Sequence, residues 1–69
     1  MYEITKEITV ETFVGIDADG ETISKTETLE VGETFDDDDV ISKDENRYEV
    51  QWGNGDVSYI PTEVVKVIA

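Results

Sequence analysis

Apolar and polar residues alternate along the first part of the chain, from residue 3 to residue 17. The even positions are mostly apolar and the odd positions mostly polar, which is typical of a strand with one buried face. Phe13 is an apolar exception on the polar face. The apolar face of this predicted strand comprises Ile4, Ile8, Val10, Val14 and Ile16.

The dipeptide Asp19-Gly20 predicts a two-residue type I′ turn after this strand, because both residues tolerate positive φ angles. A hairpin that turns there places Val10 opposite Leu29 and Ile8 opposite Val31, so apolar side chains meet across the strands. On the polar face, Thr9 lies opposite Glu30, and no two carboxylates are directly opposed. The sequence therefore predicts a long first hairpin with one acidic face.

A second hairpin is predicted around Asn54-Gly55, a strong signal for a type I′ turn. This register places Val50 opposite Tyr59, and Tyr48 and Trp52 share their face, while Ile60 falls on the polar side. Pro61 ends the strand because it has no N–H group for the sheet ladder. Residues 61–64 then suit a single 3₁₀ turn, followed by a last strand at residues 65–68.

No apolar period of 3.6 residues is sustained anywhere, so no long helix is expected. Short strands separated by tight turns are typical of small all-β domains. The length of 69 residues leaves no room for a second core. We therefore expect a single all-β domain over residues 1–69, a five-stranded barrel that begins with the long acidic hairpin.

The segment from Tyr48 to Ile68 resembles the C-terminal part of SH3-like small barrels, including Tudor- and KOW-type modules. The resemblance rests on Tyr48-x-Val50-x-Trp52-x-x-Gly55 and on Ile60-Pro61-Thr62-Glu63-Val64-Val65 with Ile68. It covers about a third of the chain, and it implies an SH3-like barrel in which the proline opens a 3₁₀ turn before the last strand.

The chain departs from the ligand-binding patterns of that group. It lacks the Ala-Leu-Tyr-Asp-Tyr-like stretch and the paired tryptophans that grip proline-rich peptides, and Val64 stands where a tyrosine is expected. A Tudor-type cage would need Tyr48, Trp52 and Tyr59 to converge on a cation. Packing of these aromatic side chains in the core is the alternative that we favour, with the second hairpin as scaffold.

Charge is the dominant compositional feature: 18 acidic residues against five basic ones give a net charge of −13. Direct binding of nucleic acid or of an anionic membrane is disfavoured, because both require Lys and Arg to neutralise phosphate. A partner with a basic surface is favoured instead. The alternative is that the charge serves only solubility and keeps the chain monomeric, and we expect a monomer.

Catalysis and cofactor binding are not expected. The chain has no cysteine and no histidine, so it lacks a thiol nucleophile and the commonest general base. The aspartates at residues 17, 19, 36 and 38 are expected to be solvated, and Asp17-Ala18-Asp19-Gly20 lacks the flanking ligands of a calcium loop. No signal peptide or membrane span is evident, and a cytoplasmic location is expected.

The acidic face is the candidate site for a partner. In the predicted register the odd-numbered glutamates of the first strand form a row, Glu30 falls between two of them, and the aspartate run extends it. Such an array resembles, in charge and size only, the acidic DNA-mimic inhibitors of phages. The alternative is an adaptor module that binds through loops or a strand edge. The candidate partner-binding residues are Glu3, Glu7, Glu11, Glu30, Asp36, Asp37, Asp38 and Asp39.

Overall fold

The computed structural model describes residues 1–68, which form short strands and two 3₁₀ turns. The all-β prediction is therefore confirmed, and the last strand follows a 3₁₀ turn after Pro61 as expected. In chain order the elements are β1 (Tyr2–Ile4), β2 (Ile8–Ile16), β3 (Thr22–Leu29), β4 (Thr34–Phe35), η1 (Asp37–Asp39), β5 (Val40–Lys43), β6 (Arg47–Gln51), β7 (Val57–Pro61), η2 (Thr62–Val64) and β8 (Val65–Val67).

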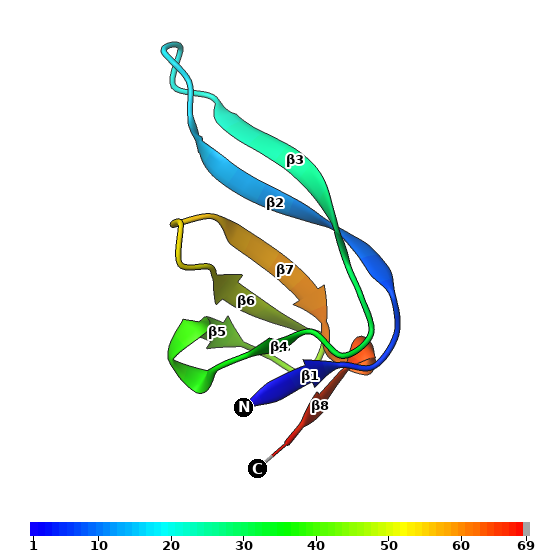
Figure 1. Cartoon of the computed structure of the whole chain (residues 1–69). Helices are drawn as coiled ribbons and strands as arrows, with labels where there is room; N and C mark the ends of the chain where they lie inside the picture. Colours follow the sequence, from blue (N-terminus) through cyan, green and yellow to red (C-terminus); the bar gives the residue numbers. More distant parts are fainter. Residues whose placement is uncertain (69) are drawn as a thin grey trace.

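The strands form two antiparallel sheets, not one closed barrel (Figure 1). The larger sheet has the order β3-β2-β7-β6-β5, and the smaller one has the order β4-β1-β8. The expected continuous strand over residues 3–17 is interrupted after Ile4. Here the Thr5 N–H donates to the Val64 carbonyl (2.8 Å), and the Ile4 carbonyl accepts the Gly32 N–H (2.9 Å). These bonds hold β1 in the smaller sheet, so the predicted five-stranded barrel is corrected.

The hydrophobic core lies between the two sheets and is drawn from both. Tyr2 stacks on Phe35 with ring centroids 5.1 Å apart, and the Tyr48 ring lies 5.0 Å from Tyr2. The larger sheet contributes aliphatic side chains beneath this aromatic cluster. The buried hydrophobic residues are Tyr2, Ile4, Val10, Leu29, Phe35, Val50, Ile60 and Val64.

The first hairpin turns through a three-residue loop instead of the predicted two-residue loop. The Asp17 N–H donates to the Glu21 carbonyl (2.8 Å), and the Gly20 N–H donates to the Asp17 carbonyl (3.0 Å). Gly20 ends the loop with a φ of 82°, a conformation that glycine adopts without strain. This arrangement, a turn followed by a glycine at positive φ, is the next most common hairpin connection.

A β-bulge between Phe13 and Gly15 shifts the pairing of this hairpin by one further residue. Leu29 therefore lies opposite Ile8, not opposite Val10 as predicted. Because the loop and the bulge together shift the register by two residues, Leu29 still shares the apolar face of β2. Val31 falls outside the strand and is 65% exposed.

The second hairpin has the same kind of loop, and here the consequence is larger. The Trp52 N–H donates to the Asp56 carbonyl (2.8 Å), so the loop comprises residues 53–55. With no compensating bulge, β7 is shifted by a single residue, and Val50 lies opposite Ser58 and not opposite Tyr59. A one-residue shift exchanges the two faces of a strand. Ile60 therefore enters the core, and Tyr59 faces the other side.

A two-stranded arm extends from the body of the molecule (Figure 1). The pairing of β2 with β7 covers Thr12 and Phe13, and beyond these residues β2 is paired only with β3. Val14, Ile16 and Ile23 are consequently exposed although they are apolar. The molecule is 42 Å long and 22 Å across in the other two directions.

A buried hydrogen-bond network joins β2, β7 and Trp52 at the base of the arm. The hydroxyl oxygens of Thr12 and Ser58 are 2.7 Å apart, and the Trp52 indole N–H donates to the Ser58 oxygen, also at 2.7 Å. Thr12 and Ser58 are fully buried. Burial of hydroxyl groups is tolerated when they are hydrogen-bonded, as these are.

We predict that Ser58→Ala lowers the free energy of unfolding by about 1–3 kcal/mol, because it removes the shared partner of a buried hydroxyl and of the indole. Thr9→Ala is the control, since it removes a hydroxyl whose side-chain hydrogen bond, to Thr28 (3.3 Å), is exposed. It should cost less than about 0.5 kcal/mol. Urea unfolding followed by Trp52 fluorescence measures both, and equal losses would contradict the role assigned to Ser58.

Candidate functional site

Four consecutive aspartates, Asp36–Asp39, connect β4 to β5, and we call them the η1 patch. Buried Phe35 and half-buried Val40 hold the two ends of the segment on the body. The turn is closed by the Asp39 N–H, which donates to the Asp36 carbonyl (3.0 Å), and the Asp39 carboxylate accepts the Asp36 N–H (3.2 Å). The patch is therefore a defined turn in which three of the four aspartates are exposed.

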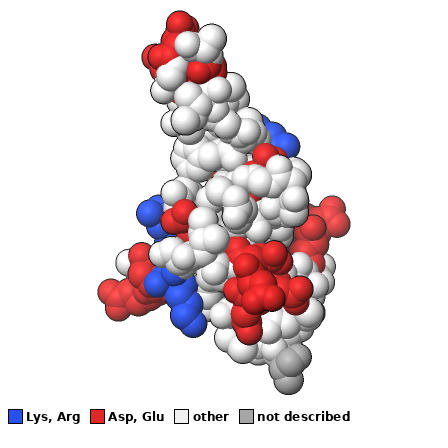
Figure 2. Space-filling view, turned by 90° about the vertical axis from the view of Figure 1, so that its left-hand side faces the viewer, with Lys and Arg blue, Asp and Glu red and all other residues white. Residues whose placement is uncertain are grey.

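Among the described residues, the η1 patch makes one ion pair. The N-terminal ammonium group is 3.5 Å from the Asp37 Oδ1, and both groups are well exposed. An exposed ion pair of this length contributes little to stability. Figure 2 shows a compact cluster of acidic side chains on the face of the body where η1 lies.

The tip of the arm carries a second acidic group, formed by Asp17, Asp19 and Glu21 (Figure 2). The Asp17 carboxylate accepts the N–H groups of Asp19 (2.9 Å) and Glu21 (3.0 Å), so it stabilises the loop. The turn role predicted for this segment is confirmed. Across residues 1–68, no cluster of three or more acidic side chains is arranged to hold a metal ion.

The predicted row of glutamates on one strand face is not formed. Glu3 belongs to the smaller sheet, where its Oε1 lies 3.0 Å from the Lys66 Nζ, whereas Glu11 belongs to the larger sheet. Glu7 lies in the connection between them. The interruption of the strand after Ile4 separates these side chains, and the sequence pattern alone did not reveal this interruption.

Glu30 is also placed differently from the prediction. It opens a β-turn in which the Glu33 N–H donates to the Glu30 carbonyl (3.1 Å), and it has no strand partner. Thr9 lies opposite Thr28 instead. Of the predicted site residues, Asp36–Asp39 therefore remain together, while the four glutamates are distributed over β1, β2 and two connections.

Several cations are engaged by nearby groups within the molecule. The Lys25 Nζ lies 3.0 Å from the Glu27 Oε1 and 3.7 Å from the Asp56 Oδ2. The hydrogen bond and the charge of Glu27 raise the pKa of Lys25 above its ordinary value of 10.5. Lys25 therefore stays charged at neutral pH, and its charge is partly balanced before any partner arrives.

Asp44 has a structural role in the loop between β5 and β6. Its Oδ1 accepts the N–H groups of Asn46 (2.7 Å) and Arg47 (2.9 Å), and these bonds lower the pKa of Asp44 below its ordinary value of 3.8. Since the folded-state pKa is lowered, the stabilisation is present above about pH 3.8 and is lost as the pH falls through the lowered value.

An aromatic contact on the outer face of the larger sheet was missed by the sequence analysis. The Arg47 guanidinium lies 4.2 Å from the centre of the Tyr59 ring, and Phe13 packs edge-on against Tyr59 at 5.5 Å. Tyr48 and Trp52 instead pack against the core. The predicted packing is therefore confirmed for these two residues, and Tyr59 cannot join them in a cage. The pairing of Phe13 and Tyr59 depends on the three-residue loop of the second hairpin.

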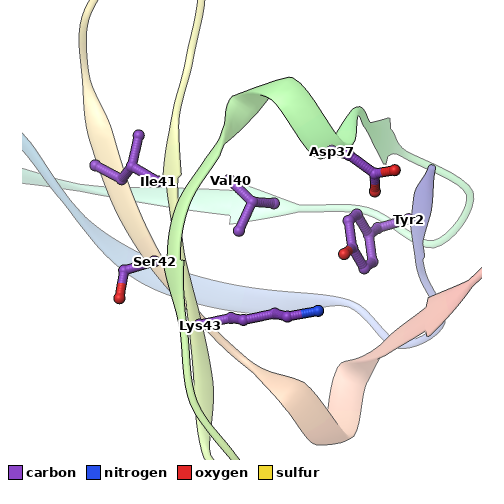
Figure 3. A pocket seen from close by; sticks show the side chains of 6 residues that line it. All are labelled: Tyr2, Asp37, Val40, Ile41, Ser42 and Lys43. Carbon is purple, nitrogen blue, oxygen red and sulfur yellow. The ribbon is translucent and has the colours of Figure 1, made fainter.

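A shallow hollow of about 380 Å³ lies beside β5 and opens to solvent. Figure 3 shows Val40 between Tyr2 and Asp37 on one side and Ile41 and Ser42 on the other, with Lys43 extending below. The hollow thus combines one acidic and one basic side chain with a mixed polar and apolar lining. Its lining residues are Tyr2, Asp37, Val40, Ile41, Ser42 and Lys43.

No family model matches the sequence, and neither curated proteins nor solved structures provide a match to this chain. Among residues 1–68 there is no helix with the length and apolar character needed to cross a membrane.

We predict that the melting temperature rises between low salt and about 0.1–0.2 M NaCl, because exposed carboxylates of the η1 patch and arm tip repel one another until salt screens them. The net charge of −13 makes repulsion between carboxylates the dominant long-range electrostatic interaction. Thermal unfolding followed by circular dichroism measures the shift, with sucrose of matched osmolality as the control. A flat or falling curve would contradict the account of uncompensated charge.

Proposed function

We propose that this protein is a non-catalytic, cytoplasmic binding module whose acidic surface engages a basic surface on another protein. The observation that supports this most directly is the η1 patch. Its four carboxylates lie on a defined turn, and the one ion pair that they make among the described residues is an exposed one to the terminal ammonium group. A surface of this kind attracts Lys- and Arg-rich partners and accelerates their association.

The sharper form of the proposal is that the partner binds nucleic acid and that the acidic surface occupies its nucleic-acid site, as DNA-mimic inhibitors do. The row of Glu3, Glu7, Glu11 and Glu30 no longer supports this form, since the structure separates these residues. The η1 patch and the arm tip take its place as the surface that would imitate phosphate groups.

An adaptor function is the second candidate, with the acidic charge serving only solubility. The edge strand β3 and the exposed apolar side chains of the arm favour it. An SH3-like relationship is part of this proposal. The order of β6, β7, η2 and β8, with Pro61 before the 3₁₀ turn, supports the relationship.

The experiment that tests the proposal is capture of proteins from a lysate of the source organism on the immobilised chain, followed by affinity measurement with the purified captured protein. We expect a nucleic-acid-binding protein that is displaced by duplex DNA and by about 0.5 M NaCl. Asp37→Asn with Asp38→Asn should weaken its binding by on the order of tenfold at low salt. Neither residue takes part in the bonds of Asp36 and Asp39 that close the turn.

The matched control is Glu45→Gln with Glu63→Gln, which removes the same charge from exposed positions on another part of the surface. When both double variants are compared at about 0.1 M NaCl, where exposed charges are screened over about 10 Å, the control should leave binding within about twofold. Equal weakening of binding by both double variants would mean that affinity depends on net charge alone and not on the η1 patch. Binding that resists salt and both variants would favour the adaptor function.

A further inference from the structure

Strand β3 forms one edge of the larger sheet over the described residues 1–68, because it pairs with β2 alone. It is eight residues long, contains no proline or glycine, and is exposed along most of its length. An edge strand presents unpaired N–H and C=O groups that can accept a further strand. The bulge between Phe13 and Gly15 lies on β2, so the free side of β3 lacks the irregularity that commonly protects an edge.

The sequence of β3 complements itself when two copies run antiparallel with Thr26 facing Thr26. Lys25 then lies opposite Glu27 of the second copy, and Ile23 lies opposite Leu29. The two-fold symmetry repeats each pair, so two charge pairs and two apolar pairs form on one face. Ser24 meets Thr28 on the other face, and every pair of side chains is compatible.

The neighbouring registers lack this match. A shift of two residues in one direction places Lys25 opposite itself, and a shift of two in the other direction places Glu27 opposite itself. Like charges that are directly opposed destabilise a strand pair. A shift of one residue places the apolar Ile23 opposite a polar residue. The register centred on Thr26 is therefore specified by its side chains.

We propose that two copies of this chain pair edge to edge through β3, with Thr26 on the two-fold axis and the two larger sheets joined into one. The arm provides a physical reason, since an isolated two-stranded hairpin is marginally stable and gains from further strands. Ile23, which is 42% exposed, becomes partly covered by the second copy, in which it lies beside the buried Leu29. Lys25 is half-exposed and can turn from its own Glu27 to that of the second copy.

The high negative charge gives this association a salt dependence opposite to that of the proposed function. Each copy carries −13, so the chains repel one another at low ionic strength and are monomeric there, as the composition suggests. Added salt screens this repulsion and should promote pairing. Failure of the dimer proposal therefore leaves the η1 patch proposal untouched, because the two concern different residues.

The first test measures mass by sedimentation equilibrium over a range of concentrations at about 0.05 M and about 0.5 M NaCl. The wild type should shift from 7.7 kDa towards twice that mass at the higher salt. Lys25→Glu and Glu27→Lys should each remain monomeric, because each places like charges opposite one another. An equimolar mixture of the two variants should form a heterodimer, because opposite charges then face each other again.

Glu27→Lys is the decisive variant, since it makes the net charge less negative. Association driven by reduced repulsion alone would increase in this variant, whereas pairing through β3 predicts a loss. Circular dichroism tests whether each variant is folded. Formation of the heterodimer is a second test, because only folded chains can pair through β3. Stronger self-association of Glu27→Lys, or dimers in both single variants, would overturn the proposal.

The second test uses disulfide formation, because the natural chain has no cysteine. Thr26→Cys should cross-link with itself under mild oxidation at about 0.5 M NaCl, since the two positions face each other. Ser24→Cys is the matched control on the same strand face. Its two copies would lie about 13 Å apart, beyond the reach of a disulfide. Equal cross-linking of the two variants, or none in Thr26→Cys together with a wild-type mass of 7.7 kDa at every concentration, would overturn the proposal and leave the edge to a strand of another protein.

Discussion

The position of Ser58 inside the core is the constraint on which the rest of the structure depends. Its hydroxyl group joins Thr12 of β2 to the Trp52 indole, and its backbone pairs with Thr12 and Val50 on either side. The face of β7 that carries Ser58 also carries Ile60, which completes the core. Since the pairing of β7 with β2 covers only Thr12 and Phe13, the part of the first hairpin beyond Phe13 extends from the body as an arm.

The all-β class, the two hairpins and the last strand could be predicted because the alternation of side chains and the 3₁₀ turn after Pro61 are local signals. Loop length could not, since Asp19-Gly20 and Asn54-Gly55 suit both a two-residue turn and a three-residue loop that ends in glycine. Because the second loop has one residue more than predicted, Ile60 lies in the core in place of Tyr59. In the first hairpin a bulge compensated for the loop, so Leu29 remains on the face of β2 that carries Val10 although the predicted register was incorrect.

The residues of the candidate site also differ in how well the sequence predicted their positions. Asp36–Asp39 stay together because they are adjacent in sequence, and no register was needed to place them. Glu3, Glu7 and Glu11 were expected to align only if one strand continued from residue 3 to residue 17. The bonds of Ile4 to Gly32 and of Thr5 to Val64 end that strand, and they join parts of the chain too distant for a periodic pattern to connect.

The two proposals assign opposite responses to salt to two different surfaces of the molecule. In these proposals, low ionic strength favours binding at the η1 patch, because salt weakens its attraction for basic groups. High ionic strength favours pairing of two chains through β3, because salt screens the repulsion between them. The two surfaces lie at different places in the fold. η1 leads into β5, and β5 and β3 form opposite edges of the larger sheet.

The central claim is that the η1 patch is the surface that meets a basic partner. The most direct measurement is a titration of the ¹⁵N-labelled protein with its captured partner at low salt, followed by amide NMR signals. The account predicts that the amides of Asp36–Asp39 shift and that their signals return on addition of salt. Shifts confined to Thr22–Leu29, with Asp36–Asp39 unchanged, would contradict it.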